Sequence, residues 1–187
     1  MNCNFPSIQD SIGQFYPGKS IFQILIGVVS FISLVYYVVI SSTIKAKSPK
    51  TSIIFAVTLI SKLLSLLIFA NVPFHDDYRL NNNSLVIYFI SSGALMYFVQ
   101  SRITSRQLLL NDFRMKMFWI YMVVIANAAV TFYRHQMQGV SFQYSLSSIC
   151  QWIAVALDIY FESLFIHEIR HLSMRIGFPL DKSSNHV

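Results

Sequence analysis

The last apolar run of the chain, Tyr144 to Ile166, constrains the fold more than any other segment. As a helix it is long enough to cross a bilayer, which takes about 20 residues. The run nevertheless contains Asp158 and Glu162, which are four residues apart and therefore lie on one helical face. A carboxylate in hydrocarbon is strongly unfavourable unless it is paired, protonated or hydrated. We therefore expect the other helices to shelter this face.

The composition indicates a membrane protein. Of its 187 residues 55% are hydrophobic and 12% are charged, whereas about 25% of residues are charged in a soluble domain. The net charge of +6 comes from basic residues in short loops between apolar runs. This distribution follows the positive-inside rule, so we expect no nucleic-acid partner. The two cysteines, Cys3 and Cys150, form no disulfide framework.

Five apolar runs predict an all-α, polytopic membrane helix bundle that forms one integral membrane domain over residues 1–187. The five predicted transmembrane helices are residues 21–40, 52–72, 84–101, 117–133 and 144–166. The first run begins only at Ile21 and has the length of a membrane anchor, so we expect no cleaved signal peptide.

The basic residues also predict the orientation of the bundle. The connections 41–50 and 102–116 and the tail after the last span together hold ten Lys and Arg. The opposite side holds three, namely Lys19, Arg79 and Arg134. Basic loops face the cytoplasm. We therefore predict a lumenal N-terminal segment, residues 1–20, and a cytoplasmic polar tail, residues 168–187.

Lys62 stands at the centre of the second span and needs a buried partner. Asp158 lies about 4 to 5 Å past the midplane of the last span, and Glu162 roughly 6 Å deeper. The similar depth predicts an ion pair between Lys62 and Asp158 inside the membrane, in a polar network that includes Glu162 and Gln151. A structural role for this pair is favoured over a catalytic one. The alternative for Lys62 and Glu162 is snorkelling or structural hydrogen bonding.

A second polar group is expected at the lumenal end. Arg134 and His135 follow the fourth span, with Asn127 two turns before Arg134, and Asn83 opens the third span on the same side. The neighbouring loop adds His75, Asp76 and Asp77. Arg binds phosphate bidentately and His transfers protons near neutral pH, so this group is a candidate site for a lipid head group. The alternative, favoured by composition alone, is an interfacial anchor within an aromatic belt.

The sequence has no metal-binding His-Cys spacing, no phosphate-binding glycine loop and no nucleophile elbow. We therefore expect no metal and no cofactor, and the residues by themselves identify no catalytic group.

Three short motifs resemble a known family. Pro6-Ser7-Ile8, followed by Ile12-Gly13, resembles the lumenal "PSxSxxIG" signature of the post-GPI-attachment-to-proteins factor 2 family. The run from Phe132 to Met137 is similar to that family's "YFRHxM" segment, and Ser91-Ser92 falls where the family has a serine pair. The family is related to the N-terminal membrane domain of the yeast calcofluor-white-hypersensitivity protein and, more distantly, to damage-regulated autophagy modulators. The resemblance covers about residues 4 to 167.

The resemblance implies a role in remodelling the lipid of glycosylphosphatidylinositol (GPI) anchors in the Golgi or endoplasmic reticulum. In the family this means fatty-acid reacylation of the lyso-anchor, or ceramide exchange in the yeast relative. The resemblance gives Arg134 and His135 a phosphoinositol ligand. It implies that the protein binds membrane lipid and GPI-anchored proteins. Other membrane proteins are further candidate partners.

Several positions depart from the family pattern. The family has a further span ahead of the lumenal signature, a Glu near Lys62, a Glu near Gln151 and a His near Glu162. A His of the family also falls near Val29. These departures leave open a non-catalytic module that binds lipid or a partner on the same fold. An ion-coupled transporter that uses the intramembrane charges is disfavoured, because the first span offers no polar route and the chain shows no internal repeat.

Overall fold

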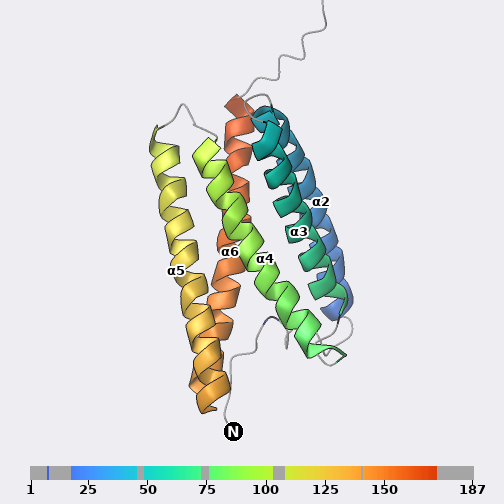
Figure 1. The fold of residues 1–187 in the computed structure, drawn as a ribbon, viewed down its shortest axis with the longest axis vertical. Helices are drawn as coiled ribbons and strands as arrows, with labels where there is room; N and C mark the ends of the chain where they lie inside the picture. Colours follow the sequence, from blue (N-terminus) through green and yellow to red (C-terminus); the bar gives the residue numbers. More distant parts are fainter. Residues whose placement is uncertain are drawn as a thin grey trace, which may run out of the picture.

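A computed structural model describes residues 8, 18–45, 49–72, 76–102, 108–139 and 141–171. These residues form an all-helical bundle and contain no strand. The helices are α2 (Gly18–Lys45), α3 (Pro49–Asn71), α4 (Tyr78–Arg102), α5 (Leu108–Gln138) and α6 (Ser141–His171). Consecutive helices run in alternate directions along the long axis of the molecule (Figure 1).

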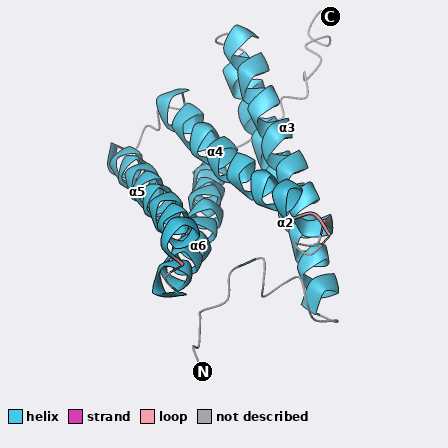
Figure 2. Ribbon diagram, turned by 60° about the horizontal axis from the view of Figure 1, so that its bottom comes forward, coloured by secondary structure: helices cyan, strands magenta, loops and turns pink. Residues whose placement is uncertain are grey.

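The helices pack as two pairs joined by α4. On one side α2 packs on α3, and on the other side α5 packs along α6. Helix α4 packs closely on α3 and also contacts α5 and α6. It crosses obliquely between the two pairs (Figure 2). Because α4 packs against helices of both pairs, its side chains are well placed to connect them.

Four helices are long and apolar enough to cross a membrane. Their candidate spans are Lys19–Val38, Lys50–Asn71, Tyr78–Ser101 and Asp112–Gln138. They overlap the first four predicted spans, so the multi-pass character that the sequence predicts is confirmed. Large apolar side chains cover their outer faces, as expected of helices that face lipid.

Helix α6 contains the fifth predicted span but is not among the four apolar spans of the described residues. It has 31 residues, about 46 Å at the rise of an α-helix. It runs beside α5 and antiparallel to it (Figure 1). A fifth crossing of the membrane therefore stays a prediction. The helix continues to His171 and so enters the segment that was predicted to be a polar tail.

Local sequence explains where several helices begin and end. Pro49 is the first residue of α3, where its missing N–H is not needed. Asp77 precedes α4 and accepts a hydrogen bond from the backbone N–H of Leu80 at 2.9 Å, as an N-cap. Gly139 ends α5 with a φ of 66°, and its N–H donates to the carbonyl of His135 at 2.8 Å. Asp77, predicted to belong to the lumenal polar group, thus caps a helix, and His75 lies outside the described residues.

One predicted loop was wrong in extent. The sequence predicted a basic connection over residues 102–116, but α5 already begins at Leu108. Arg114 is therefore a helical residue and only 1% exposed. The ring of its neighbour Phe113 lies 6.3 Å from that of Tyr160, which places this part of α5 against α6. The longer helix removes Arg114 from the predicted loop and buries it.

Asn81 ties the beginning of α4 to the end of α3. Its side-chain amide donates to the carbonyl of Val72 at 2.7 Å and to that of Phe69 at 3.3 Å. Asn81 is 3% exposed. The last carbonyls of a helix have no partner within it, so this amide satisfies groups that would otherwise be left without a hydrogen bond.

We predict that Asn81→Leu lowers the free energy of unfolding by about 1 to 3 kcal/mol, because it leaves buried carbonyls unsatisfied. Thermal unfolding of the purified protein in detergent measures this loss as a lower transition temperature. The half-buried neighbour Asn82 is the control, because Asn82→Leu removes no described hydrogen bond. An equal shift for the two variants would contradict the capping role of Asn81.

Candidate functional site

The centre of the bundle holds an ion cluster of Lys62, Asp158 and Glu162. Lys62 Nζ lies 2.8 Å from Asp158 Oδ2 and 2.8 Å from Glu162 Oε1. It also donates to Asp158 Oδ1 at 3.0 Å. The two carboxylates project from successive turns of α6, so one ammonium group from α3 reaches both.

Hydroxyl groups from two other helices complete the cluster. Tyr88 and Ser92 of α4 donate to Asp158 Oδ2 at 2.6 and 3.2 Å. Ser33 of α2 donates to Glu162 Oε2 at 2.6 Å. The rings of Tyr37 and Tyr88 also lie 5.6 and 5.7 Å from Lys62 Nζ, within the range of a cation–π interaction. Side chains of α2, α3, α4 and α6 thus meet at one point.

The cluster is enclosed. Lys62 is 2% exposed and Asp158 is 3% exposed, whereas the side chain of Glu162 keeps 14% of its surface exposed. Every described oxygen of the two carboxylates accepts at least one hydrogen bond. A buried ion pair is stable only when such bonds satisfy its remaining polar atoms. The arrangement is therefore that of a structural core, in which each carboxylate oxygen already accepts a hydrogen bond.

The sequence predicted that Lys62 and Asp158 lie at a similar depth in the membrane. It did not predict the hydroxyl groups that donate hydrogen bonds to the two carboxylates. Ser33 is one of few polar residues in its span, and Tyr88 and Ser92 are four residues apart on one face of α4. Polar residues of different spans at a common depth are therefore the signal that would have found them. Depth in the membrane does not show which face of a helix points into the bundle. The hydrogen-bond partners of the two carboxylates are therefore identified only by the packing of the helices.

Gln151 does not join the cluster. It precedes Asp158 by two helical turns, which is about 10 Å along the axis. Its Oε1 atom is buried and has no hydrogen-bond partner among the described residues. Among the described residues the ion cluster therefore consists of Lys62, Asp158 and Glu162, and a network that includes Gln151 stays a prediction.

The four residues predicted to hold a lipid head group are not gathered into an enclosed site. Asn83, Asn127 and Arg134 are exposed. The amide of Asn127 donates to the carbonyl of Val123 in its own helix at 2.8 Å. Thr131, between Asn127 and Arg134, is buried and donates to the carbonyls of Asn127 and Ala128. The described residues thus show separate side chains at one end of the bundle, and their shared role stays a prediction.

The end of α5 is held on two sides. His135 is half-buried, and its ring lies 5.1 Å from that of Tyr144 in α6. Gln136 donates to the hydroxyl of Tyr78 at the beginning of α4 at 3.2 Å. Arg134 lies between these contacts in sequence, and it forms no hydrogen bond or ion pair with the described residues. The exposed guanidinium of Arg134 lies at a helix end whose neighbouring residues contact α4 and α6. A guanidinium in this position is able to bind a phosphate from outside the bundle.

No group of three His, Cys, Asp or Glu side chains within the described helices and turns is placed to bind a metal ion. The site that these residues form is an internal ion cluster with an exposed cation at one end of the bundle. This defines a multi-pass helical membrane protein with a buried ion cluster.

The chain matches one protein-family model, Frag1/DRAM/Sfk1/Cwh43P N-terminal domain, over residues 1–172. The match spans nearly the whole chain, so the protein belongs to this family. The resemblance to the membrane domain of the yeast Cwh43 protein is thereby confirmed at the level of the family. Searches of curated proteins and of solved structures gave no significant match.

We predict that Lys62→Met destabilises the bundle by about 3 to 5 kcal/mol, because it leaves two carboxylates buried without a cation. Asp158→Asn should be milder, since Glu162 still neutralises Lys62. Thermal unfolding in detergent and the fraction of monodisperse protein after purification measure the effect. The control is Lys50→Met, which removes an exposed lysine from the same helix. If Lys62→Met and Lys50→Met unfold at the same temperature, the cluster does not hold the helices together.

Proposed function

We propose that this protein acts in the lipid remodelling of GPI anchors, by fatty-acid reacylation or lipid exchange on GPI-anchored proteins. In this proposal it resides in the Golgi or endoplasmic reticulum membrane, with a lumenal N-terminus and a cytoplasmic C-terminus. Membership of a family that includes the Cwh43P N-terminal domain supports the proposal. The similarity of Phe132 to Met137 to a segment of the GPI-remodelling family supports it as well.

The observation that carries the proposal is the position of Arg134 at the end of α5. Its side chain is exposed, it has no described partner, and it lies near the end of a candidate span. Basic side chains at that level meet the phosphates of lipid head groups. The ring of the adjoining His135 lies 5.1 Å from that of Tyr144 in α6. A phosphoinositol group would meet the exposed guanidinium at this end of α5.

The ion cluster lies apart from this site, because its side chains come from α2, α3, α4 and α6. Each carboxylate oxygen already accepts a hydrogen bond from Lys62 or from a hydroxyl group, which favours a structural role over that of a general base. This supports a second candidate function, in which the chain binds the anchor lipid or a membrane-protein partner and another protein performs the reaction. The hydrogen-bonded carboxylates favour this candidate, and the sequence departures at Lys62 and Glu162 agree with it.

Complementation tests the proposal. The chain is expressed in cells that lack their GPI-remodelling family member, and surface GPI-anchored protein and the anchor fatty acids are measured. We expect rescue by the unaltered chain and at least about a tenfold loss of rescue with Arg134→Ala, since a charge-assisted phosphate contact contributes about 1.5 to 3 kcal/mol. His135→Ala should also reduce rescue.

The matched control is Arg79→Ala, which removes another exposed arginine at the same end of the bundle. Equal loss with Arg79→Ala and Arg134→Ala would point to general surface charge instead of a head-group site. Lack of rescue by a well-expressed chain in the correct membrane overturns remodelling as its function and favours the non-catalytic binding module.

A further inference from the structure

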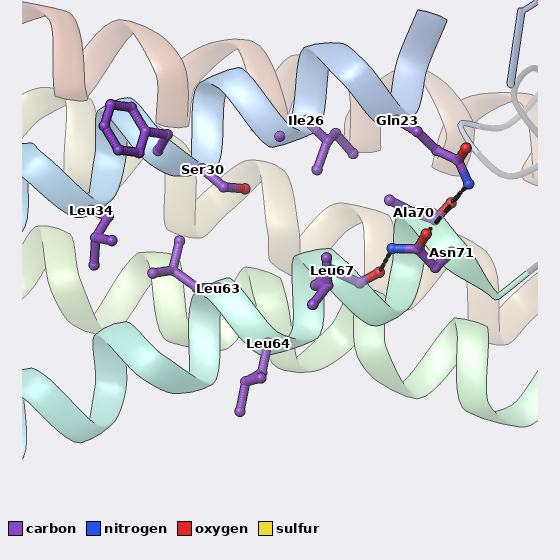
Figure 3. Close-up of a pocket in the computed structure, with 11 residues that line it drawn as sticks. Gln23, Ile26, Ser30, Leu34, Leu63, Leu64, Leu67, Ala70 and Asn71 are labelled. Carbon is purple, nitrogen blue, oxygen red and sulfur yellow. Dashed lines mark hydrogen bonds between the residues drawn. The ribbon is translucent and has the colours of Figure 1, made fainter. Parts of the chain in front are cut away.

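A groove runs along the outer surface of the bundle between α2 and α3. It has a volume of about 490 Å³. Its sides are formed mainly by aliphatic side chains, among them Ile26, Leu34, Leu63 and Leu67 (Figure 3). Gly27 and Ser30 line it from α2 and leave it wide. Since both helices are candidate membrane spans, the groove faces the acyl chains of the bilayer.

One end of the groove is polar. Gln23 and Asn71 lie there, and Gln23 Nε2 donates to the carbonyl of Ala70 at 3.2 Å and to Asn71 Oδ1 at 3.5 Å (Figure 3). The aromatic pair Phe22 and Phe69, with ring centroids 6.4 Å apart, joins the two helices at the same level. The groove therefore has the polarity of a lipid, with hydrogen-bonding groups at one end and hydrocarbon along the rest.

The groove begins near one end of the membrane span of α2. Gln23 lies four residues after the beginning of the candidate span Lys19–Val38, and Leu34 lies four residues before its end. From Gln23 to Leu34 the helix rises about 16 Å, which is about half of the ~30 Å hydrocarbon core. An acyl chain that enters beside Gln23 would thus lie along the groove and extend past the middle of the span.

A positive charge stands beyond the polar end. Lys19 precedes Gln23 by one helical turn and is half-buried, and in the described part of the chain it has neither an ion pair nor a hydrogen bond. It lies in the first turn of α2, which contains no acidic residue. A helix N-terminus already carries a partial positive charge and free N–H groups, so a lysine there is unfavourable without an anion. A phosphate is one of the anions that such a terminus binds.

From these observations we propose that the α2–α3 groove binds one phosphate-bearing glycerolipid. One acyl chain lies in the groove, and Lys19 with the first turn of α2 meets the phosphate. The Asn71 amide donates one N–H to the carbonyl of Leu67 at 2.8 Å, and its second N–H meets an ester oxygen of the lipid. The site is formed by other helices than the Arg134 site, and it does not depend on the proposed role in GPI remodelling.

Gly27 offers a variant that fills the groove without damaging the fold. A Cβ placed on Gly27 would have no atom within 4 Å, and leucine favours a helix more than glycine does. Gly27→Leu should therefore leave the protein as stable as before while its side chain occupies the position of the acyl chain. Val28→Leu is the control, because it enlarges an exposed side chain that does not line the groove.

The experiment uses the full chain in detergent micelles and a phosphatidylglycerol with a photoreactive diazirine in one acyl chain. We expect cross-links on peptides of α2 and α3, and a several-fold loss of them with Gly27→Leu but not with Val28→Leu. Thermal unfolding of each variant checks that the fold is intact. Equal labelling of the wild type and Gly27→Leu, or labelling spread evenly over all helices, overturns the proposal.

The head-group part is tested with a diacylglycerol that carries the same photoreactive chain and no phosphate. Wild-type protein should bind the phosphatidylglycerol several-fold better than the diacylglycerol, and Lys19→Gln should remove this preference. Equal labelling by the two lipids would overturn the assignment of a phosphate. Because the measurement uses purified protein, its outcome is independent of rescue in cells, and either proposal can fail alone.

Discussion

The ion cluster at Lys62 is the interaction on which the rest of this structure depends. Its charges are unfavourable in a membrane unless they meet, and they come from α3 and α6. Hydroxyl donors from α2 and α4 satisfy the remaining oxygens. Packing in lipid gains little from the hydrophobic effect. A shared polar centre therefore supplies a strong reason for these four helices to adopt one mutual arrangement.

A second group of polar interactions lies at the ends of helices. Asn81 satisfies the last carbonyls of α3, Asp77 caps α4, and Gly139 turns the chain from α5 into α6. Each of these interactions lies where the backbone leaves regular structure. The exposed side chain of Arg134, by contrast, forms no hydrogen bond or ion pair with the described residues. For this reason we assign a structural role to the buried charges and propose ligand binding for the exposed Arg134.

The two proposed lipid contacts are formed by different parts of the bundle. Arg134 belongs to α5, which packs along α6, whereas the groove lies between α2 and α3 on the other side of α4 (Figure 2). Ser33, one turn beyond the groove residue Ser30, ties α2 to Glu162. The position of α2, and with it the width of the groove, therefore depends on the central cluster. A change at Lys62 would be expected to affect the groove before it affects α5.

The sequence by itself determined the helical class, the first four spans and the approximate depth of Lys62 and Asp158, because apolar length and the rise of a helix depend on local order alone. It did not determine the rotation of each helix, and so it missed Ser33, Tyr88 and Ser92 as hydrogen-bond donors to the two carboxylates. Only the packed bundle decided that Arg114 is buried and Arg134 exposed, since burial depends on which neighbour covers a face. The groove, too, exists only between two helices.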